Sequence, residues 1–536
     1  MGPPIAIGGS ASATMDAGLD RTAFAAFAVV LVGVSVVMLV AGRWRPLAAG
    51  EIPPGGELED WALAGRRFGS LQTWFLLGGS IFTAYTFIAV PALVYGVGAL
   101  GFFAVPYTII VFQLAYVILP WLHRKARVHG WITPADAVRA RFGSPSLAVA
   151  VALTGLLATM PYVALQLLGL SALLTTLGLP ANGPIADAAL AITFAALAVG
   201  TYRHGLRAPA LVSVIKGVLA FVTTAALVAL ALATVGGPGP VFTEAGSALA
   251  DRGGSLLLPD GMASSYLTLA IGSALALLLY PHVLLPAFAA RDETVLRRAC
   301  TGLLAWTALL AVVALAGLAA LASGIRVPEG RAELAVPALL HQSLPPVVAG
   351  AVLAVVGIGA LVPAAVMSAA AASTFASNIY LEYLNPTAIP AQVTQVARVV
   401  SIVVKFGALA FVLGLRSQDA IALQLLGGVW ILQTLPALLI GLRWHLPHRY
   451  ALLAGLVSGV VSGTWLVAAQ GYVAVTQIHV SGHDVGIYAG LVALAVNLTV
   501  TAVLTPLLDR AGITRGTDST GLALPPAARR EWGVFS

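Results

Sequence analysis

The sequence predicts an all-α membrane protein with about 13 transmembrane helices. Of its 536 residues, 59% are apolar and only 9% are charged. A water-soluble domain could not bury that much apolar surface, so lipid is expected to be the solvent of the fold. Apolar runs long enough to cross a hydrocarbon core of about 30 Å recur along the chain, between charged or Pro- and Gly-rich breaks.

The apolar runs predict one transmembrane domain between two short tails. We expect the tails at 1–21 and 508–536 and the domain at 22–507. The first run is longer than a signal-peptide core and follows acidic residues, which favours an uncleaved anchor. The thirteen predicted spans lie at 22–42, 70–97, 99–120, 147–178, 185–202, 208–235, 264–290, 299–323, 346–377, 396–415, 418–442, 450–470 and 485–507.

The distribution of charge predicts the orientation. Asp16 and Asp20 precede the first span, and Arg43 and Arg45 follow it. Alternating spans then place 21 of the 28 Lys and Arg residues in loops on the side of the carboxyl terminus. By the positive-inside rule this side is cytoplasmic and the amino terminus lies outside. The net charge of +7 is therefore expected to orient the protein and not to bind nucleic acid.

Two of the predicted spans carry helix-breaking residues. The second contains LLGGSIFTAYTFIAVPALVYGVG and the seventh contains LYPHVLLPAFAARD. Backbone groups can leave a helix inside a membrane only where they face protein or a wet cavity. These spans begin two consecutive groups of five, 70–235 and 264–442, as in alternating-access transporters whose site lies near the midplane. Gly and Pro are also common in ordinary membrane helices, but the matched positions favour repeats.

Several stretches resemble the sodium:solute symporter family. They are LAGRRFG, TFIAVPALVYGVGALGFFAVPYTIIV, ARVHGWITPADAVRARFG, LYPHVLLPAFAARD and PAAVMSAAAASTFASNIY, within about 60–454. ALQLLGGVWILQTLPALLIGL and GLRAPALVSVIKG are most similar to its bacterial monocarboxylate branch, which moves lactate, pyruvate and related short acids. The resemblance implies a bacterial inner-membrane protein. It also implies a five-plus-five inverted-repeat, LeuT-like fold with one extra amino-terminal and two extra carboxyl-terminal helices.

The resemblance also implies a cation site beside the first interrupted helix. Carried over by position, the helix carbonyls are those of Gly79 and Phe82, and the motif A-x-x-[ST]-[ST] begins at Ala365 with its first hydroxyl at Ser368. The second hydroxyl is missing. In many relatives the fifth repeat helix contributes D-x-x-Q; here Ser213 and Lys216 take these two positions.

Lys216 is one of three lysines in the chain and lies within an apolar run. It is roughly 13 Å into the hydrocarbon core and costs roughly 3 kcal/mol there unless it is compensated, so it should face the bundle interior. We expect its ammonium to occupy the cation region and to carry the coupling proton. A permanently charged structural tie and direct pairing with a substrate carboxylate are the alternatives. Lys405 is expected to be either an ion-path residue or a snorkelling anchor.

A small carboxylate is expected near the two breaks, where half-helix amino termini present free N–H groups. Core packing is the alternative role for the aromatic candidates, and protein partners are the alternative for the histidine and the glutamine. The candidates are Tyr85, Thr86, Tyr280, His282, Trp430 and Gln433.

The preferred hypothesis is a secondary transporter of a short monocarboxylate, coupled to H⁺ or Na⁺ and without a cofactor. A sodium-driven symporter for another small solute is the main alternative, and a transporter-like sensor is disfavoured because the final segment is too short for a signalling domain. An enzyme is not expected, since the chain shows no carboxylate dyad, serine elbow or phosphate loop. The single cysteine, Cys300, excludes an internal disulfide. Membrane lipids are the other expected partners, and either a monomer or a homo-oligomer fits the sequence.

Overall fold

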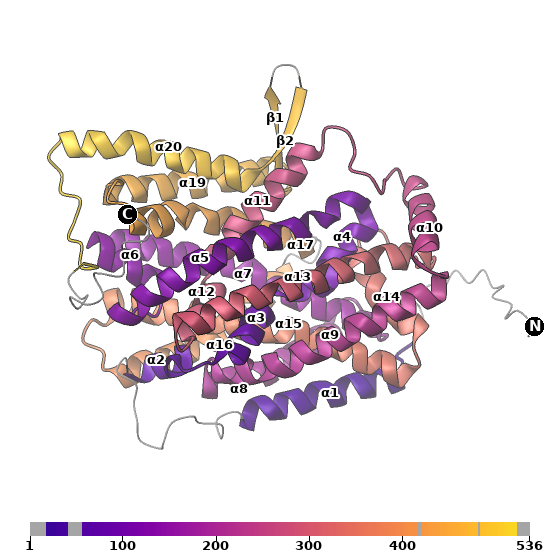
Figure 1. The fold of residues 1–536 in the computed structure, drawn as a ribbon. Coiled ribbons are helices and arrows are strands. Elements are labelled where there is room, and N and C mark those ends of the chain that lie inside the picture. Colours follow the sequence, from indigo (N-terminus) through magenta and orange to yellow (C-terminus); the bar gives the residue numbers. More distant parts are fainter. Residues whose placement is uncertain (1–17, 41–55, 415–419, 481–482, 522–536) are drawn as a thin grey trace, which may run out of the picture.

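The computed structural model describes residues 18–40, 56–414, 420–480 and 483–521. Long helices run side by side through the molecule, and one β-hairpin projects from it (Figure 1). The helices of the first predicted repeat are α3 (Ser70–Ile81), η3 (Tyr85–Ala89), α4 (Val90–Val97), α5 (Ala104–His129), α7 (Pro145–Thr176), α8 (Pro184–His204) and α9 (Arg207–Val235). Those of the second are α11 (Ala263–Leu279), α12 (Pro281–Ala289), α13 (Glu293–Ala322), α15 (Pro346–Phe375), α16 (Pro390–Gly414), α17 (Ala420–Ile431), η7 (Leu432–Thr434), η8 (Pro436–Ile440) and α18 (Gly441–Arg443).

Short helices cover the two ends of this bundle, and further helices flank it. The flanking helices are α1 (Arg21–Val40), which packs on α15 and α8, and the antiparallel pair α19 (Arg449–Ala469) and α20 (Ala489–Arg510), which packs on α17. The short helices are α2 (Gly56–Leu63), η2 (Ala64–Arg66), η4 (Gly98–Phe103), α6 (Pro134–Phe142), α10 (Pro238–Ala250), η5 (Ala332–Leu334), α14 (Ala335–Ser343) and η6 (Ala376–Leu384).

Within the described ranges, eleven helices are long and apolar enough to cross a membrane, or twelve if the bent pair α11–α12 is one span. This count treats Tyr85–His129, 45 residues, as a single helix. At 1.5 Å per residue it would be about 68 Å long, more than twice the hydrocarbon core. Gly98, with φ +66°, interrupts it at η4. The stretch Tyr85–His129 therefore contains the end of the second predicted span and all of the third. Within each of the 13 predicted spans the structure has a helix.

The structure corrects the all-α prediction at one place. Strands β1 (Val475–Val480) and β2 (His483–Tyr488) form an antiparallel hairpin ahead of α20, so the last helix begins at Ala489 and not at 485. The alternating VTQIHV and HDVGIY around Ser-Gly are a hairpin pattern. The signal was present in the sequence, between the predicted spans 450–470 and 485–507.

The loops predicted to share one side of the membrane meet at one end of the bundle, which we call the α6 end. Ion pairs Arg207–Asp60 and Arg141–Asp518 connect these loops. Arg66 also donates to the Trp131 carbonyl over 2.8 Å. The first residue of α1 and the last of α20 lie at opposite ends of the bundle (Figure 1), as an odd number of spans requires.

Candidate functional site

The second predicted span is broken between α3 and η3, which we call the first break. Phe82 has extended backbone angles, φ −86° and ψ 92°. The helical ladder cannot continue through this residue, so nearby amides and carbonyls need other partners. Ala84 N–H donates to the Gln166 side-chain oxygen over 3.0 Å, and Tyr85 N–H donates to the Thr83 hydroxyl over 3.0 Å.

Lys216 supplies the donors for the carbonyls at the first break. Its Nζ lies 2.7 Å from the carbonyl oxygens of Gly79 and Phe82, and 3.2 Å from that of Gly359. The side chain is completely buried. An ammonium has three N–H donors, so its hydrogen-bonding capacity is filled by three carbonyls. None of its hydrogen-bond partners in the described part of the chain is a carboxylate.

The carbonyl that α15 supplies to the ammonium lies outside the carried-over motif. Gly359, and not Ala365 or Ser368, reaches the ammonium, while the Ser368 hydroxyl donates to the Ala365 carbonyl in its own helix over 3.0 Å. Pro363 lies four residues after Gly359 within α15. Because proline has no N–H to donate to the carbonyl four residues earlier, the Gly359 oxygen is free to accept from Lys216.

Ser213 belongs to the seam between α9 and α3, although it does not contact the ammonium. Its hydroxyl donates to the Pro209 carbonyl over 2.7 Å. A Cβ on Gly79 would lie only 2.9 Å from the Ser213 oxygen. The two helices therefore approach closely at Gly79, and this approach brings the α3 carbonyls within reach of α9.

Aromatic rings close the space beside this site. Trp306 is fully buried and stacks on Phe82, with ring centroids 5.3 Å apart. Its ring also packs against Phe75 and Phe221, at 6.4 and 5.2 Å. A Cβ on Gly217, next to the lysine in sequence, would clash with the Phe75 ring. The ammonium therefore lies in a densely packed region of the bundle.

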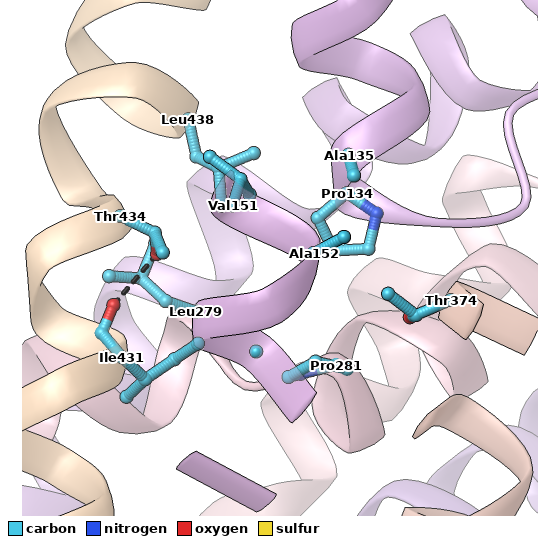
Figure 2. Close-up of a pocket in the computed structure, with 11 residues that line it drawn as sticks. Pro134, Ala135, Val151, Ala152, Leu279, Pro281, Thr374, Ile431, Thr434 and Leu438 are labelled. Atoms are coloured by element: carbon cyan, nitrogen blue, oxygen red, sulfur yellow. Dashed lines mark hydrogen bonds between the residues drawn. The ribbon is translucent and has the colours of Figure 1, made fainter. Parts of the chain in front are cut away.

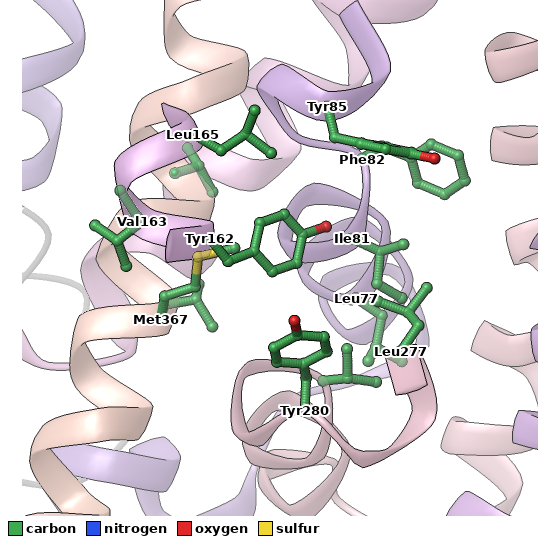
Figure 3. Close-up of a cluster of buried hydrophobic side chains, with 14 of the residues drawn as sticks. Leu77, Ile81, Phe82, Tyr85, Tyr162, Val163, Leu165, Leu277, Tyr280 and Met367 are labelled. Atoms are coloured by element: carbon green, nitrogen blue, oxygen red, sulfur yellow. The ribbon is translucent and has the colours of Figure 1, made fainter. Parts of the chain in front are cut away.

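The second break separates α11 from α12, which are bent by 50°. Tyr280 at the junction has φ −62° and ψ 134°, and Pro281 begins α12. Tyr280, His282 and, from α7, Tyr162 are all fully buried, with ring centroids 5.0–5.3 Å apart. Neither phenolic hydroxyl and neither imidazole nitrogen makes a hydrogen bond of normal geometry among the described residues, and the Thr83 side chain is the polar group beside the Tyr162 hydroxyl. Figure 3 shows Tyr280 and Tyr162 with their hydroxyls between the two broken helices.

Tyr85 and Thr86 lie in η3, directly after the first break. Both are buried, and the Tyr85 hydroxyl makes no hydrogen bond of normal geometry within the described ranges, although the Tyr107 side chain lies beside it. The Tyr85 ring packs edge-on against Tyr107, 6.0 Å between centroids. Tyr162 was missed by sequence reasoning because a tyrosine in an apolar run carries no charge or motif. Pro161 before it was the only local signal of a special position.

The structure places Trp430 and Gln433 away from both breaks. The Trp430 indole donates to Thr464 of α19 over 2.9 Å, and the Gln433 amide donates to the Val429 and Gly490 carbonyls. Both side chains face the α19–α20 pair. The face of α17 toward the second break carries Gly427 instead, where a Cβ would lie 2.5 Å from the Tyr280 hydroxyl oxygen. At this position α17 contributes close packing of a glycine against the Tyr280 hydroxyl.

Lys405 is buried in α16 and does not snorkel. Only 1% of the residue is exposed, and Nζ donates to the Ser401 carbonyl one turn earlier over 3.0 Å. Among the described residues it shares no hydrogen-bond partner with Lys216.

A narrow pocket lies on the α6 side of the second break (Figure 2). Its free volume of about 10 Å³ is room for about one water molecule. Pro281 and Leu279 from the break line it, opposite Gly155 of α7 and Pro134 of α6. A Cβ on Gly155 would lie 3.2 Å from the Pro281 ring, so α7 and α12 are in close contact at this position.

The two interrupted helices, with polar groups gathered between them and a buried charge beside one, define a secondary transporter of the LeuT-like class. The sequence comparison identifies the family: a model of the sodium:solute symporter family matches residues 61–459, and the chain belongs to this family.

Curated relatives and a solved structure agree with this assignment. A monocarboxylate transport permease protein of Rhizobium johnstonii is 43% identical over 92% of this chain and 98% of its own. An uncharacterized symporter of Bacillus subtilis, YodF, is 30% identical over 91% of this chain and 94% of its own. The solved outward-open structure of a Na⁺-coupled sialic acid symporter superposes with a TM-score of 0.71, at 16% identity, over 91% of this chain and 98% of that one. At this identity the structural likeness shows the fold.

Proposed function

We propose that this transporter takes up a short monocarboxylate together with a proton, and that Lys216 carries the proton. The substrate class is supported by the 43% identical relative, whose name describes a monocarboxylate permease. It is also supported by the neutral hydroxyls of Tyr85, Tyr162 and Tyr280, which are buried without partners among the described residues. Phenolic hydroxyls can donate to a carboxylate and to a carbonyl or hydroxyl oxygen beside it.

The observation that carries proton coupling is the filled coordination of Lys216. A charged nitrogen lies 2.7 Å from two carbonyls of the broken helix, the ligands that the resemblance assigns to a metal cation. Two cations cannot share this position, since their repulsion in a medium of low dielectric is large. An ammonium without a paired carboxylate is also unfavourable in the membrane interior. Loss of its proton would remove this unfavourable charge.

Deprotonation would change the structure in a defined way. A neutral amine keeps two N–H donors and presents a lone pair, so it can satisfy only two of the three carbonyls. The longest of the three bonds, 3.2 Å to Gly359, is the first to be lost. Because Gly359 belongs to α15 and the other two carbonyls to α3 and its break, the proton controls the link between these helices.

The test is uptake by reconstituted vesicles under an imposed pH gradient, with labelled C2–C4 acids. Wild-type protein should accumulate its acid when the lumen is alkaline, and Lys216→Ala should lose this accumulation. Lys125→Ala, a lysine at the α6 end of α5, is the matched control and should accumulate normally. Unchanged pH-driven accumulation by Lys216→Ala would refute proton coupling through this residue.

Sodium coupling is the second candidate, because family membership favours it. Sodium would need the Gly79, Phe82 and Gly359 oxygens that Lys216 now occupies. Replacing sodium by choline at fixed pH separates the two candidates. If coupling is to protons, the uptake rate should change by less than about twofold. A sodium symporter should lose at least about tenfold of its uptake rate, which corresponds to ~1.4 kcal/mol.

We also propose that the α6 end faces the cytoplasm of a bacterial inner membrane, with the amino terminus outside. The clustering of basic loops at this end supports the orientation. In a Cys300→Ala background, an impermeant maleimide applied to intact cells should label Leu19→Cys and leave Gly521→Cys unlabelled. The reverse pattern would invert the assignment.

A further inference from the structure

After α20 the chain turns back along the α6 end as an extended segment, residues 513–520, which we call the strap. Ile513 accepts a hydrogen bond from the His448 ring over 3.2 Å, and Arg515 donates to the His445 carbonyl over 2.6 Å. Further along, Ser519 N–H donates to the Ala140 carbonyl of α6 over 2.9 Å. The strap therefore runs from the loop before α19 onto α6.

Arg141 of α6 is the centre of the contact with the strap. Its side chain is 6% exposed, and Nη1 lies 2.5 Å from the Asp518 carboxylate. Its other nitrogens donate to the carbonyls of Gly441, over 2.9 Å, and Trp444, over 3.4 Å. One guanidinium thus joins α6, the end of the last repeat helix and the strap.

Asp518 is fixed in place by a turn within the strap. Its second oxygen accepts from the Thr520 N–H over 2.9 Å and from the Thr520 hydroxyl over 2.7 Å. Burial raises the pKa of Asp518, but these hydrogen bonds and the Arg141 charge outweigh burial and hold the pKa below its ordinary value of 3.8. The carboxylate is consequently charged at neutral pH and remains a partner for Arg141.

Two glycines allow the strap to lie directly on α6. Gly143, at the carboxyl-terminal cap of α6, has φ +54°, and a Cβ there would clash with Thr517. Gly516 has φ +95°, and a Cβ there would clash with the Phe142 carbonyl. Both positions therefore need glycine for backbone conformation and for space.

The same α6 forms one wall of the pocket below the second break. Pro134 and Ala135, at the start of this nine-residue helix, line the pocket opposite Pro281. Arg141 and the strap hold the other end of the helix against Gly441 and Trp444. Outward movement of α6 would widen the pocket and separate α6 from α7, on which it packs, and the contacts of the strap oppose this movement.

We propose that the strap is an intramolecular latch on α6 that limits how often the pocket beneath the second break opens. Breaking the Asp518–Arg141 contact frees α6 and increases the exposed time of residues such as Thr434, which lines the pocket. The proposal requires only the alternating-access fold, and neither the substrate nor the coupling ion enters it.

The test is the rate at which a pocket cysteine reacts with an impermeant maleimide. Cys300 is the only cysteine, so Cys300→Ala with Thr434→Cys gives a single reporter. In lipid nanodiscs, where water reaches both faces, Asp518→Ala should raise the labelling rate by about 3- to 10-fold. Arg141→Lys, which keeps the charge and loses the forked contacts, should raise it in the same direction.

Asp509→Ala is the matched control, because Asp509 pairs with Arg515 at the base of the strap and not with α6. It should label within about twofold of the parent. Labelling of Asp518→Ala at the parental rate, in protein that elutes as a single species, would overturn the proposal. An equal increase in Asp509→Ala would also overturn it, because general loosening of the tail would then be the cause.

Discussion

The two breaks of this transporter sit at matched places in the chain but are stabilised in opposite ways. At the first, the ammonium of Lys216 satisfies three backbone carbonyls, and Gln166 satisfies an amide. At the second, Tyr162, Tyr280 and His282 present polar atoms without partners among the described residues. Buried polar groups are normally paired. The backbone of the first break is therefore satisfied within the protein, whereas side chains beside both breaks, Tyr85 after the first and Tyr162, Tyr280 and His282 at the second, keep polar atoms available for hydrogen bonding.

This difference predicts that replacing Lys216 at the first break lowers the stability of the fold as well as coupling, whereas removing hydroxyls at the second break lowers the affinity for substrate. Lys216→Met should lower the free energy of unfolding by about 2–3 kcal/mol, because three buried carbonyls lose their donor. Lys405→Met is the control: it removes one bond to its own helix and should cost less. Thermal unfolding in detergent measures both. A Lys216→Met protein as stable as wild type would contradict the role of the ammonium as a tie.

Removing hydroxyls at the second break should weaken substrate binding and leave stability unchanged. For Tyr280→Phe and Tyr162→Phe we expect KM to rise about 5- to 30-fold, corresponding to ~1–2 kcal/mol of lost hydrogen bonding. Tyr488→Phe is the matched control, since that hydroxyl donates to the Leu425 carbonyl over 2.8 Å. It should lose stability and keep KM. An unchanged KM in both test variants would show that these hydroxyls do not bind substrate.

A subtler change at the first break is Pro363→Ala. Alanine restores an N–H that can bond the Gly359 carbonyl within α15 and compete with Lys216. Pro363→Ala should therefore shift the pH dependence of uptake and lower its rate by about 3- to 5-fold, ~1 kcal/mol. Pro346→Ala, at the first residue of the same helix, removes a proline without freeing a partner for this carbonyl. If both variants behave alike, the Gly359 bond does not contribute.

The smallest effect is expected outside both breaks, at the amino-terminal cap of α1. Hydrogen bonding from Ala23 N–H, with a smaller contribution from His341, lowers the pKa of Asp20 below 3.8. A lowered pKa in the folded protein means that the carboxylate stabilises above its unfolded value, and that this stability is lost as the pH falls through the folded value. Asp20→Asn should cost at most about 1 kcal/mol at neutral pH. The difference in Tm from wild type should shrink below pH 4.

The sequence predicted the positions of the two breaks because their causes are local. A glycine pair, and a proline following tyrosine, weaken a helix wherever they occur. Lys216 could be singled out because a lone charge in an apolar run must be compensated by the interior. The fold then followed from the spacing of the spans and from the family resemblance.

The remaining site residues depended on which face of each helix turns inward. The hydroxyl motif led to Ser368, whereas the helix presents Gly359, and the useful signal was a proline four residues later. Trp430 of α17 and Gln433 of η7 turned outward toward α19 and α20. Apart from Gln424, helix α17 is apolar or glycine on every side, so periodicity could not distinguish its faces.

The aromatic rings around Lys216 separate its amine from bulk water. Under the proposal of proton coupling, and with Trp306 stacked on Phe82, the Lys216 amine would exchange protons with bulk water only when the helices around it separate. A membrane containing this protein should consequently show little passive acid leak while no substrate is being carried. Trp306→Ala removes the ring that covers Phe82 and should therefore increase the leak of protons through the protein in the absence of substrate.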